Sequence, residues 1–356
     1  MERIRVELSG VPETLLGNLG RRAAAARAGV LDDPLAIRVV DRLDYDFTDT
    51  TRGARLHALR VATFDMAVRR FLISHPAGTV VALGEGLETQ FWRVDNGQVR
   101  WLTVDVPETI ELRRLLLPDG PRRSSHCGSA LDLEWVASLN PADKVLVTAQ
   151  GLLPYFQRDQ VYTLIAALAE RLPGSLLVFD VVPVAMLNVV RRGSGRERDL
   201  AVELWSWLFD PDERATIRAI PGVDELRDLA PPLSLGVASL GIAAITRLPI
   251  GLRYLLPVIS ILQARFRTVS ANESGMQASS QGARMTPLKE SRQSTLPVLR
   301  ESRCATRLER DRRNLPIGGC LRPGSWLARI PLPVGRARPD AVRDPEVHEH
   351  PRDREQ

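Results

Sequence analysis

The chain contains few of the residues that build disulfide frameworks and metal clusters. Its 356 residues include three cysteines, Cys127, Cys304 and Cys320, and no two of them form a CxxC pair. This spacing indicates neither a disulfide scaffold nor a structural zinc site, so we expect free thiols. No other cluster of metal-ligating residues is predicted.

Long apolar runs are also missing. No uninterrupted stretch reaches the length of about 18 apolar residues that a membrane-spanning helix needs. The most apolar segment, 233–262, is interrupted by Arg247 and Arg253 and by prolines and glycines. Residues 1–7 alternate charged and apolar side chains, unlike the apolar core of a signal peptide. We therefore expect a cytoplasmic protein without an integral membrane segment.

The formal net charge of +5 is concentrated at one end of the chain. Residues 267–356 hold 17 Lys and Arg against 11 Asp and Glu, so residues 1–266 are close to neutral. The same stretch is rich in Arg, Pro, Ser and Gly, and Trp326 is its single aromatic residue. These features predict a basic, disordered tail. They do not predict a nucleic-acid partner, because no aromatic side chains are interleaved with the charges to stack on bases.

Up to residue 266 the sequence alternates short apolar runs with amphipathic ones, the pattern of an open α/β sheet covered by helices. The predicted strands are Thr79–Leu83, Val99–Val104, Lys144–Thr148 and Ser175–Asp180. The predicted helices are Glu13–Ala28, Gly53–Ser74, Pro107–Leu116 and Gln157–Leu172. The first two of these helices lie outside the strand–helix core unit.

A GxG turn follows the first predicted strand. Gly84, Glu85 and Gly86 come directly after Val80–Leu83, and glycines in such a turn let a ligand approach the backbone closely. Asp105 ends the next strand, where its carboxylate can accept hydrogen bonds from both hydroxyls of a ribose. Together the turn and the carboxylate predict a site for an adenosine-containing ligand.

The charge of this turn distinguishes two such ligands. A pyrophosphate needs bare backbone amides, whereas this turn carries Glu85 and Glu88. Thr89 also stands where the dinucleotide fingerprint has its third glycine or an alanine. An acidic turn suits the sulfonium and ammonium of S-adenosylmethionine, so this methyl donor is favoured over NAD.

The stretch VVALGEGLETQFWRVDNGQVRWLTVDVPETIELRRLLLP closely resembles the cofactor-binding core of the leucine carboxyl methyltransferase family, in particular its bacterial polyketide-synthesis O-methyltransferase branch. The resemblance extends from about Gly10 to Pro183 through GVPETLLGNLGRRAAAAR, LRVATFDMAVRRFL, SALDLEWV and VLVTAQGLLPYF. It implies a Rossmann-like, class I methyltransferase sheet with helices on both faces. It also implies a helical lid over 1–75, a cofactor-binding core over 76–183 and a substrate-side region over 184–266.

The resemblance also implies a set of residues that bind S-adenosylmethionine. Arg60 matches the arginine that pairs with the methionine carboxylate, and Asp132 with Leu133 matches the pair at the adenine. Gln150 stands where relatives often carry glutamate, which leaves its side chain's role open. The complete set of cofactor-binding candidates is Arg60, Gly84, Glu85, Gly86, Asp105, Asp132, Leu133 and Gln150.

Several of these positions have a second explanation in the sequence. Arg60 could be a surface charge, and Asp132 could cap a helix over Leu133–Leu139. Tyr45, Asp46 and Tyr155 lie in matched segments near the expected acceptor pocket, where a packing role fits them equally well.

The predicted reaction is O-methylation of a small molecule, with a polyketide-derived acceptor implied by the resemblance. A carboxylate, with a pKa near 4, arrives ionised, whereas a phenol, with a pKa near 10, benefits from a base. No Ser/His/Asp set is evident in the domain, which tilts the interpretation toward a carboxylate without deciding it. A catalytically silent relative that only binds cofactor is the alternative, and no oligomeric state is predicted.

The resemblance weakens beyond Pro183 and stops near Phe266. The sequence leaves two explanations open for the tail that follows: a frameshift that replaced the usual C-terminus, or a natural disordered extension. A frameshift would also predict a domain that lacks its last strand and exposes a sheet edge.

Overall fold

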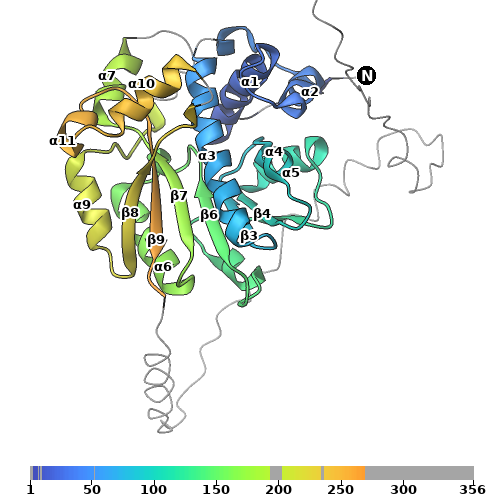
Figure 1. Ribbon diagram of the computed structural model, residues 1–356. Coiled ribbons are helices and arrows are strands. Elements are labelled where there is room, and N and C mark those ends of the chain that lie inside the picture. Colours follow the sequence, from blue (N-terminus) through green and yellow to red (C-terminus); the bar gives the residue numbers. More distant parts are fainter. Residues whose placement is uncertain are drawn as a thin grey trace, which may run out of the picture. The chain divides into compact units, whose positions relative to one another are not determined.

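A seven-stranded sheet forms the centre of the part of the chain that the structure describes. The computed structural model describes residues 3–268 except 7, 9, 52, 193–202, 234 and 235, and these residues belong to one compact unit (Figure 1). The predicted disordered tail falls outside the described residues from position 269 onward, so its disorder stays a prediction.

The sheet contains the strands β5-β4-β3-β6-β7-β9-β8 in spatial order, and the first five of these are parallel. β9 runs antiparallel to both of its neighbours. The strands are β3 (Thr79–Leu83), β4 (Arg100–Asp105), β5 (Arg123–Cys127), β6 (Val145–Ala149), β7 (Leu176–Val181), β8 (Val223–Leu229) and β9 (Ser260–Phe266). A two-stranded sheet pairs β1 (Ile4–Arg5) with β2 (Leu43–Asp44).

Helices connect these strands and precede them. The α-helices are α1 (Thr14–Arg27), α2 (Pro34–Arg42), α3 (Ala54–Ser74), α4 (Gln90–Val94), α5 (Pro107–Leu116), α6 (Arg158–Arg171), α7 (Val184–Arg191), α9 (Pro211–Ala219), α10 (Val237–Ile245) and α11 (Ile250–Arg253). Short 3-10 turns are η1 (Val11–Glu13), η2 (Thr48–Thr51), η3 (Glu134–Ser138) and η4 (Leu153–Tyr155). No helix among the described residues is long and apolar enough to cross a membrane.

Both faces of the sheet are covered by helices, as the sequence predicts. Successive side chains of a strand point to opposite faces. Val80 and Ala82 of β3 join the apolar cluster that contains α3, while Val81 and Leu83 join the cluster that contains α6. In Figure 1 α3 crosses in front of the sheet and α6 lies behind it. β3 and β6 are fully buried and, apart from one threonine each, apolar, because each is covered on both sides.

The four predicted strands and four predicted helices are confirmed with ends shifted by about a residue. Three strands of the seven-stranded sheet were not predicted, and two of them lack a clear apolar pattern. β5 reads RSSHC and is only partly buried, and β8 reads VDELRDL with exposed charges. The third, β9, ends at Phe266 and lies between β7 and β8. The two explanations of the tail, and the missing strand that a frameshift would predict, stay predictions because the tail lies outside the described residues.

The order of the strands places a crevice at the end of β3. The chain leaves β3 toward β4 and β5 on one side, and continues from β6 to β7 on the other. Such a reversal of strand order opens a crevice beyond the carboxyl ends of the strands, and ligands of open α/β sheets bind there. The GxG turn after β3 and Asp105 at the end of β4 both lie at this edge.

The N-terminal helices are fixed to this edge by packing and by buried charges. Leu16 and Leu19 of α1 and Val39 of α2 pack against Leu87, which follows the GxG turn. Charged residues of α1, α3, α4, the N-cap of α2 and the loop after the turn form a group that we call the lid–turn ion network, which comprises Arg22, Asp33, Asp65, Glu88 and Arg93.

Arg93 of α4 is the centre of the lid–turn ion network. Its Nη1 lies 2.8 Å from Asp33 Oδ2 and 2.8 Å from Glu88 Oε1, and its Nε and Nη2 donate to both oxygens of Asp65. Arg22 of α1 approaches Glu88 Oε2 at 3.1 Å and donates to the carbonyl of Leu87 at 2.6 Å. The network therefore links α1, the start of α2, and α3 to one loop.

Glu88 provides a test of this network. Burial alone would raise the pKa of Glu88, but Arg22 and Arg93 outweigh burial and lower it from an ordinary value near 4.5 to about 2. A carboxyl with a lowered pKa stabilises the fold above its unfolded pKa, and this contribution is lost as pH falls toward the folded pKa. We expect Glu88→Gln to lower the free energy of unfolding near pH 7 by on the order of 3 kcal/mol.

The measurement is urea unfolding of both proteins between pH 7 and pH 3, with about half of the difference lost by pH 3. Glu85→Gln is the matched control, because burial raises the pKa of Glu85. Ionisation of Glu85 is therefore less favourable in the folded protein, so its contribution to the free energy of unfolding falls as pH rises, opposite to that of Glu88. A Glu88→Gln difference that stays constant with pH would contradict the assignment.

Candidate functional site

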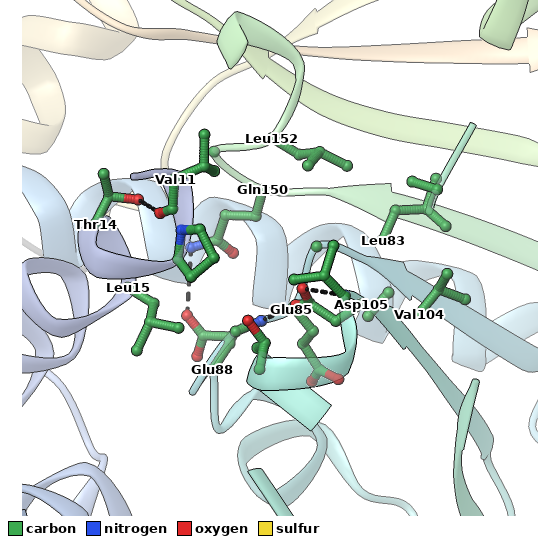
Figure 2. Close-up of a pocket in the computed structure, with 18 of the residues that line it drawn as sticks. Val11, Thr14, Leu15, Leu83, Glu85, Glu88, Val104, Asp105, Gln150 and Leu152 are labelled. Carbon is green, nitrogen blue, oxygen red and sulfur yellow. Dashed lines mark hydrogen bonds between the residues drawn. The ribbon is translucent and has the colours of Figure 1, made fainter. Parts of the chain in front are cut away.

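A cavity of about 310 Å³ lies at the carboxyl edge of the sheet, between the sheet and the N-terminal helices. Four strand-end segments line it: 82–88, 104–106, 128–130 and 150–152. Arg60 of α3 also lines it, as does part of the N-terminal segment, namely Val11, Pro12, Thr14, Leu15, Asn18 and Arg22. Figure 2 shows Thr14 and Leu15 on one side of the cavity and Leu83, Val104 and Asp105 on the other.

The GxG turn is held open by its glycines and by one arginine. Gly84 and Gly86 have φ values of 58° and 57°, in the left-handed region where a side chain is unfavourable. A Cβ on Gly84 would also lie 2.7 Å from Leu152 Cδ1. Arg113 of α5 donates through Nη1 to the carbonyls of Gly86 and Glu88, both at 2.8 Å. Arg113 therefore fixes the turn, and Leu152 packs where a side chain on Gly84 would lie.

Asp105 joins this turn to the end of β4. Its Oδ2 accepts from the amide of Gly86 at 2.7 Å, and its Oδ1 accepts from the amide of Val106 at 2.8 Å. Burial raises the pKa of Asp105, although both amides favour the ionised form. A carboxylate oxygen accepts more than one hydrogen bond, so both oxygens can still accept from a ligand's hydroxyls.

The two glutamates of the turn are occupied by protein groups. Glu85 is buried, and its carboxylate accepts from Trp101 Nε1 and from Thr103 Oγ1 and pairs with Arg113 at 2.9 Å. Glu88 belongs to the lid–turn ion network. Nearby arginines therefore compensate the negative charge that the sequence assigned to a cationic ligand. Glu85 lines the cavity, but its carboxylate serves the turn.

Arg60 and Gln150 present unpaired polar atoms at the cavity. Arg60 Nε lies 2.8 Å from Asp180 Oδ2 in an ion pair, and its buried Nε and Nη2 have no hydrogen-bond partner. Gln150 donates weakly to Glu88 Oε2 at 3.4 Å, and its buried Oε1 has no partner. Buried polar atoms without partners are costly, so a donor and an acceptor here indicate a site for a polar ligand.

Asp132 and Leu133 do not line the cavity; the residues there are Gly128, Ser129 and Ala130, just before them. Asp132 is exposed, and it does not cap the following turn η3, whose N-cap is Leu133. Leu133 has a φ of 52°, the only positive value among the described residues other than glycine. Such strained positions often accompany functional sites. The adenine-binding role of both residues stays a prediction.

Of the three candidates for the acceptor pocket, one lines the cavity and two do not. Tyr155 lines the cavity, and its hydroxyl donates to Thr14 Oγ1 at 3.2 Å. Tyr45 and Asp46 are exposed and do not line it. Asp46 accepts from the amide and hydroxyl of Thr48, and these hydrogen bonds lower its pKa. The structure therefore gives Asp46 a local role at the start of η2 and Tyr45 an edge contact with Phe47.

The sequence did not indicate several residues that shape this site. Arg22 and Thr14 of α1 line the cavity, Arg113 holds the turn, and Asp180 at the end of β7 pairs with Arg60. A usable signal was a charged residue on the apolar face of a predicted element, such as Asp180 after LLVF. Among the described residues no group of three His, Cys, Asp or Glu side chains is placed to hold a metal ion.

Comparison with known proteins gives consistent results. The family model for leucine carboxyl methyltransferase matches residues 17–169. The tetracenomycin polyketide synthesis O-methyltransferase TcmP of Streptomyces glaucescens is 33% identical over 183 residues, which cover 50% of this chain and 68% of that protein. The S-adenosyl-L-methionine-dependent methyltransferase dpfgK of Gibberella zeae is 30% identical over 257 residues, 63% of this chain and 83% of that protein.

Among solved structures, the plantazolicin methyltransferase BamL covers 72% of this chain at 12% identity with a TM-score of 0.44. The family assignment rests on the family model and the two sequence relatives. On that basis, the chain belongs to the leucine carboxyl methyltransferase family and is a methyltransferase that uses S-adenosylmethionine.

Proposed function

We propose that the chain transfers a methyl group to an oxygen atom of a small molecule, either a carboxylate or a phenolic hydroxyl. The observation that carries this proposal is the cavity at the ends of β3, β4 and β6. Polar groups that suit the methyl donor line one part of it, and apolar side chains line another part. Leu152, Tyr155 and Phe156 form the apolar part, beside Val11 and Pro12 of the N-terminal segment.

The residues of the cavity fit S-adenosylmethionine. The partnerless Nη2 of Arg60 suits the ligand's carboxylate, and the partnerless Oε1 of Gln150 suits its ammonium group. Asp105 lies at the end of β4, where it can accept from the ribose hydroxyls. Gly84 and Gly86 line the cavity between these groups, and without side chains they let the chain that joins the groups approach the backbone. When bound, S-adenosylmethionine supplies a methyl group that leaves its sulfonium as a new O–CH₃ bond forms.

Among the described residues, the lining of the cavity contains no histidine or cysteine that could act as a general base. Its carboxylates are Glu85, Glu88, Asp105 and Glu108, and the first two of these pair with arginines. Burial raises the pKa of Tyr155, so this phenol stays protonated near neutral pH and serves as a hydrogen-bond donor to Thr14. Proximity and alignment then supply the rate enhancement, which suits an acceptor oxygen that arrives ionised. A carboxylate meets this condition at neutral pH, and a phenol meets it less well.

The relatives support oxygen as the acceptor atom. TcmP is named as an O-methyltransferase of polyketide synthesis, and we propose a polyketide-derived or similar aromatic acceptor for this chain. The apolar, partly aromatic end of the cavity fits such a molecule.

A mass-spectrometric screen tests this function. The enzyme, isotopically labelled S-adenosylmethionine and a panel of aromatic acids and phenols are incubated together, and products are examined for one labelled methyl group. A hydroxybenzoate that carries both groups should give the ester in preference to the ether. Binding of the methyl donor without any labelled product across the panel would instead support a catalytically silent relative.

The pH dependence of transfer separates the two acceptor groups. With a carboxylate acceptor the rate should stay level between about pH 6 and pH 9, because the acceptor is ionised throughout. With a phenol it should rise by about tenfold per pH unit, because no protein base takes the proton. A phenol rate that is level near neutral pH would contradict the absence of a base.

Replacing Asp105 tests the donor site. Asp105→Ala should remove charge-assisted hydrogen bonds worth about 1.5 to 3 kcal/mol each and weaken S-adenosylmethionine binding at least about tenfold. Calorimetric titration measures the affinity, with circular dichroism to establish that the variant is folded. Asp95→Ala is the control, because Asp95 pairs with Arg122 and does not line the cavity. Unchanged affinity in a folded Asp105→Ala protein would remove Asp105 from the donor site.

A further inference from the structure

We propose that Asp180 is a positioning residue that aims Arg60 at the carboxylate of the methyl donor. The proposal rests on the proposed donor site and adds a residue that does not itself line the cavity. Asp180 lies at the end of β7 and is 2% exposed, and Arg60 reaches it from α3. The pair therefore connects a helix of the N-terminal segment to the sheet.

The geometry of the pair leaves the hydrogen-bond donors of the guanidinium available. Asp180 Oδ2 lies 2.8 Å from Arg60 Nε and forms an ion pair with it, but Nε makes no hydrogen bond. Nη2, which lies next to Nε on the guanidinium, is also buried and has no hydrogen-bond partner. A guanidinium has donors on two edges, so one edge can bind a fixed carboxylate while another binds a ligand's carboxylate. A lysine ammonium has no second edge of this kind.

Asp180 fixes a second element of the same site. Its Oδ1 accepts from the amide of Gly151 at 2.6 Å, directly after Gln150. Gly151 has a φ of 69°, and a Cβ there would lie 2.5 Å from Arg60 Nη2. The backbone at Gly151 and the side chain of Arg60 therefore lie close together, and Asp180 contacts both. One carboxylate sets the position of Arg60 relative to the segment that carries Gln150.

Charge explains why a carboxylate is needed at this position. Arg60 is largely buried, and a buried guanidinium without a partner is strongly unfavourable. Asp180 neutralises Arg60 in the empty site. The ligand's carboxylate then meets an arginine that is already ordered, so less side-chain entropy is lost on binding.

The test compares two donors that differ in one group. Decarboxylated S-adenosylmethionine keeps the sulfonium and the ammonium and lacks only the carboxylate. Asp180→Asn keeps the size of the side chain and an oxygen for the Gly151 amide, but removes the anion that faces Arg60. We expect this variant to bind S-adenosylmethionine about tenfold more weakly and the decarboxylated ligand within about twofold of wild type. Asp180→Asn and Arg60→Gln should also be strongly non-additive in the double variant.

Asp228→Asn is the matched control, because Asp228 is another buried partner of arginines, Arg214 and Arg253, and does not line the cavity. It should lower the melting temperature without changing the ratio of the two affinities. An Asp180→Asn protein that weakens both ligands equally would overturn the proposal, because a merely structural role predicts equal losses.

If Asp180→Asn does not fold, Arg60→Lys tests the proposal instead. A lysine keeps the positive charge that pairs with Asp180 but has no second edge of donors, so this variant should bind S-adenosylmethionine no better than its decarboxylated form. A variant that still prefers S-adenosylmethionine would overturn the proposal. Failure of the wild-type protein to bind either donor would instead refute the proposed function, and the two failures are thus distinguishable.

Discussion

The structure depends on the burial of charged groups around one short loop. Residues 84–88 line the cavity, and the same loop anchors the N-terminal helices through Glu88. Arg93 and Arg22 can be buried there only because carboxylates from α2, α3 and the loop surround them. The same ion pairs therefore set the shape of the cavity and hold the N-terminal helices against it. A substitution that breaks these ion pairs should alter both.

The two glutamates of the turn pair with arginines of the protein and are not free to attract a cationic ligand. The sequence suggested that Glu85 and Glu88 attract a cationic ligand, and the family assignment agrees with that ligand. In the structure Glu85 pairs with Arg113, and Glu88 pairs with Arg22 and Arg93. Their visible role is to fix the backbone of the turn. The unpaired atoms that suit a ligand belong to Arg60 and Gln150 instead.

The sequence predicted the parts of the fold whose pattern is local. Buried parallel strands such as β3 and β6 read as apolar runs, and α3 and α6 show helical spacing, so their positions were within about a residue. β5 and β8 carry polar residues at the sheet margins and gave no such signal. Asp180 and Arg22 were missed because their roles come from pairing across the fold, with partners 120 and 66 positions away in Arg60 and Glu88. Tyr45 and Asp46 were placed by resemblance, and the surface position of both shows that a matched segment need not reach the cavity.

The central claim is that this cavity binds S-adenosylmethionine. Its most direct test is calorimetric titration of the full-length wild-type chain with S-adenosylmethionine, S-adenosylhomocysteine and NAD⁺ under identical conditions. We expect both S-adenosyl ligands to bind with one molecule per chain and to compete with each other, and we expect NAD⁺ to give no binding heat. Absence of binding by both S-adenosyl ligands, or tighter binding of NAD⁺ than of either, would contradict it.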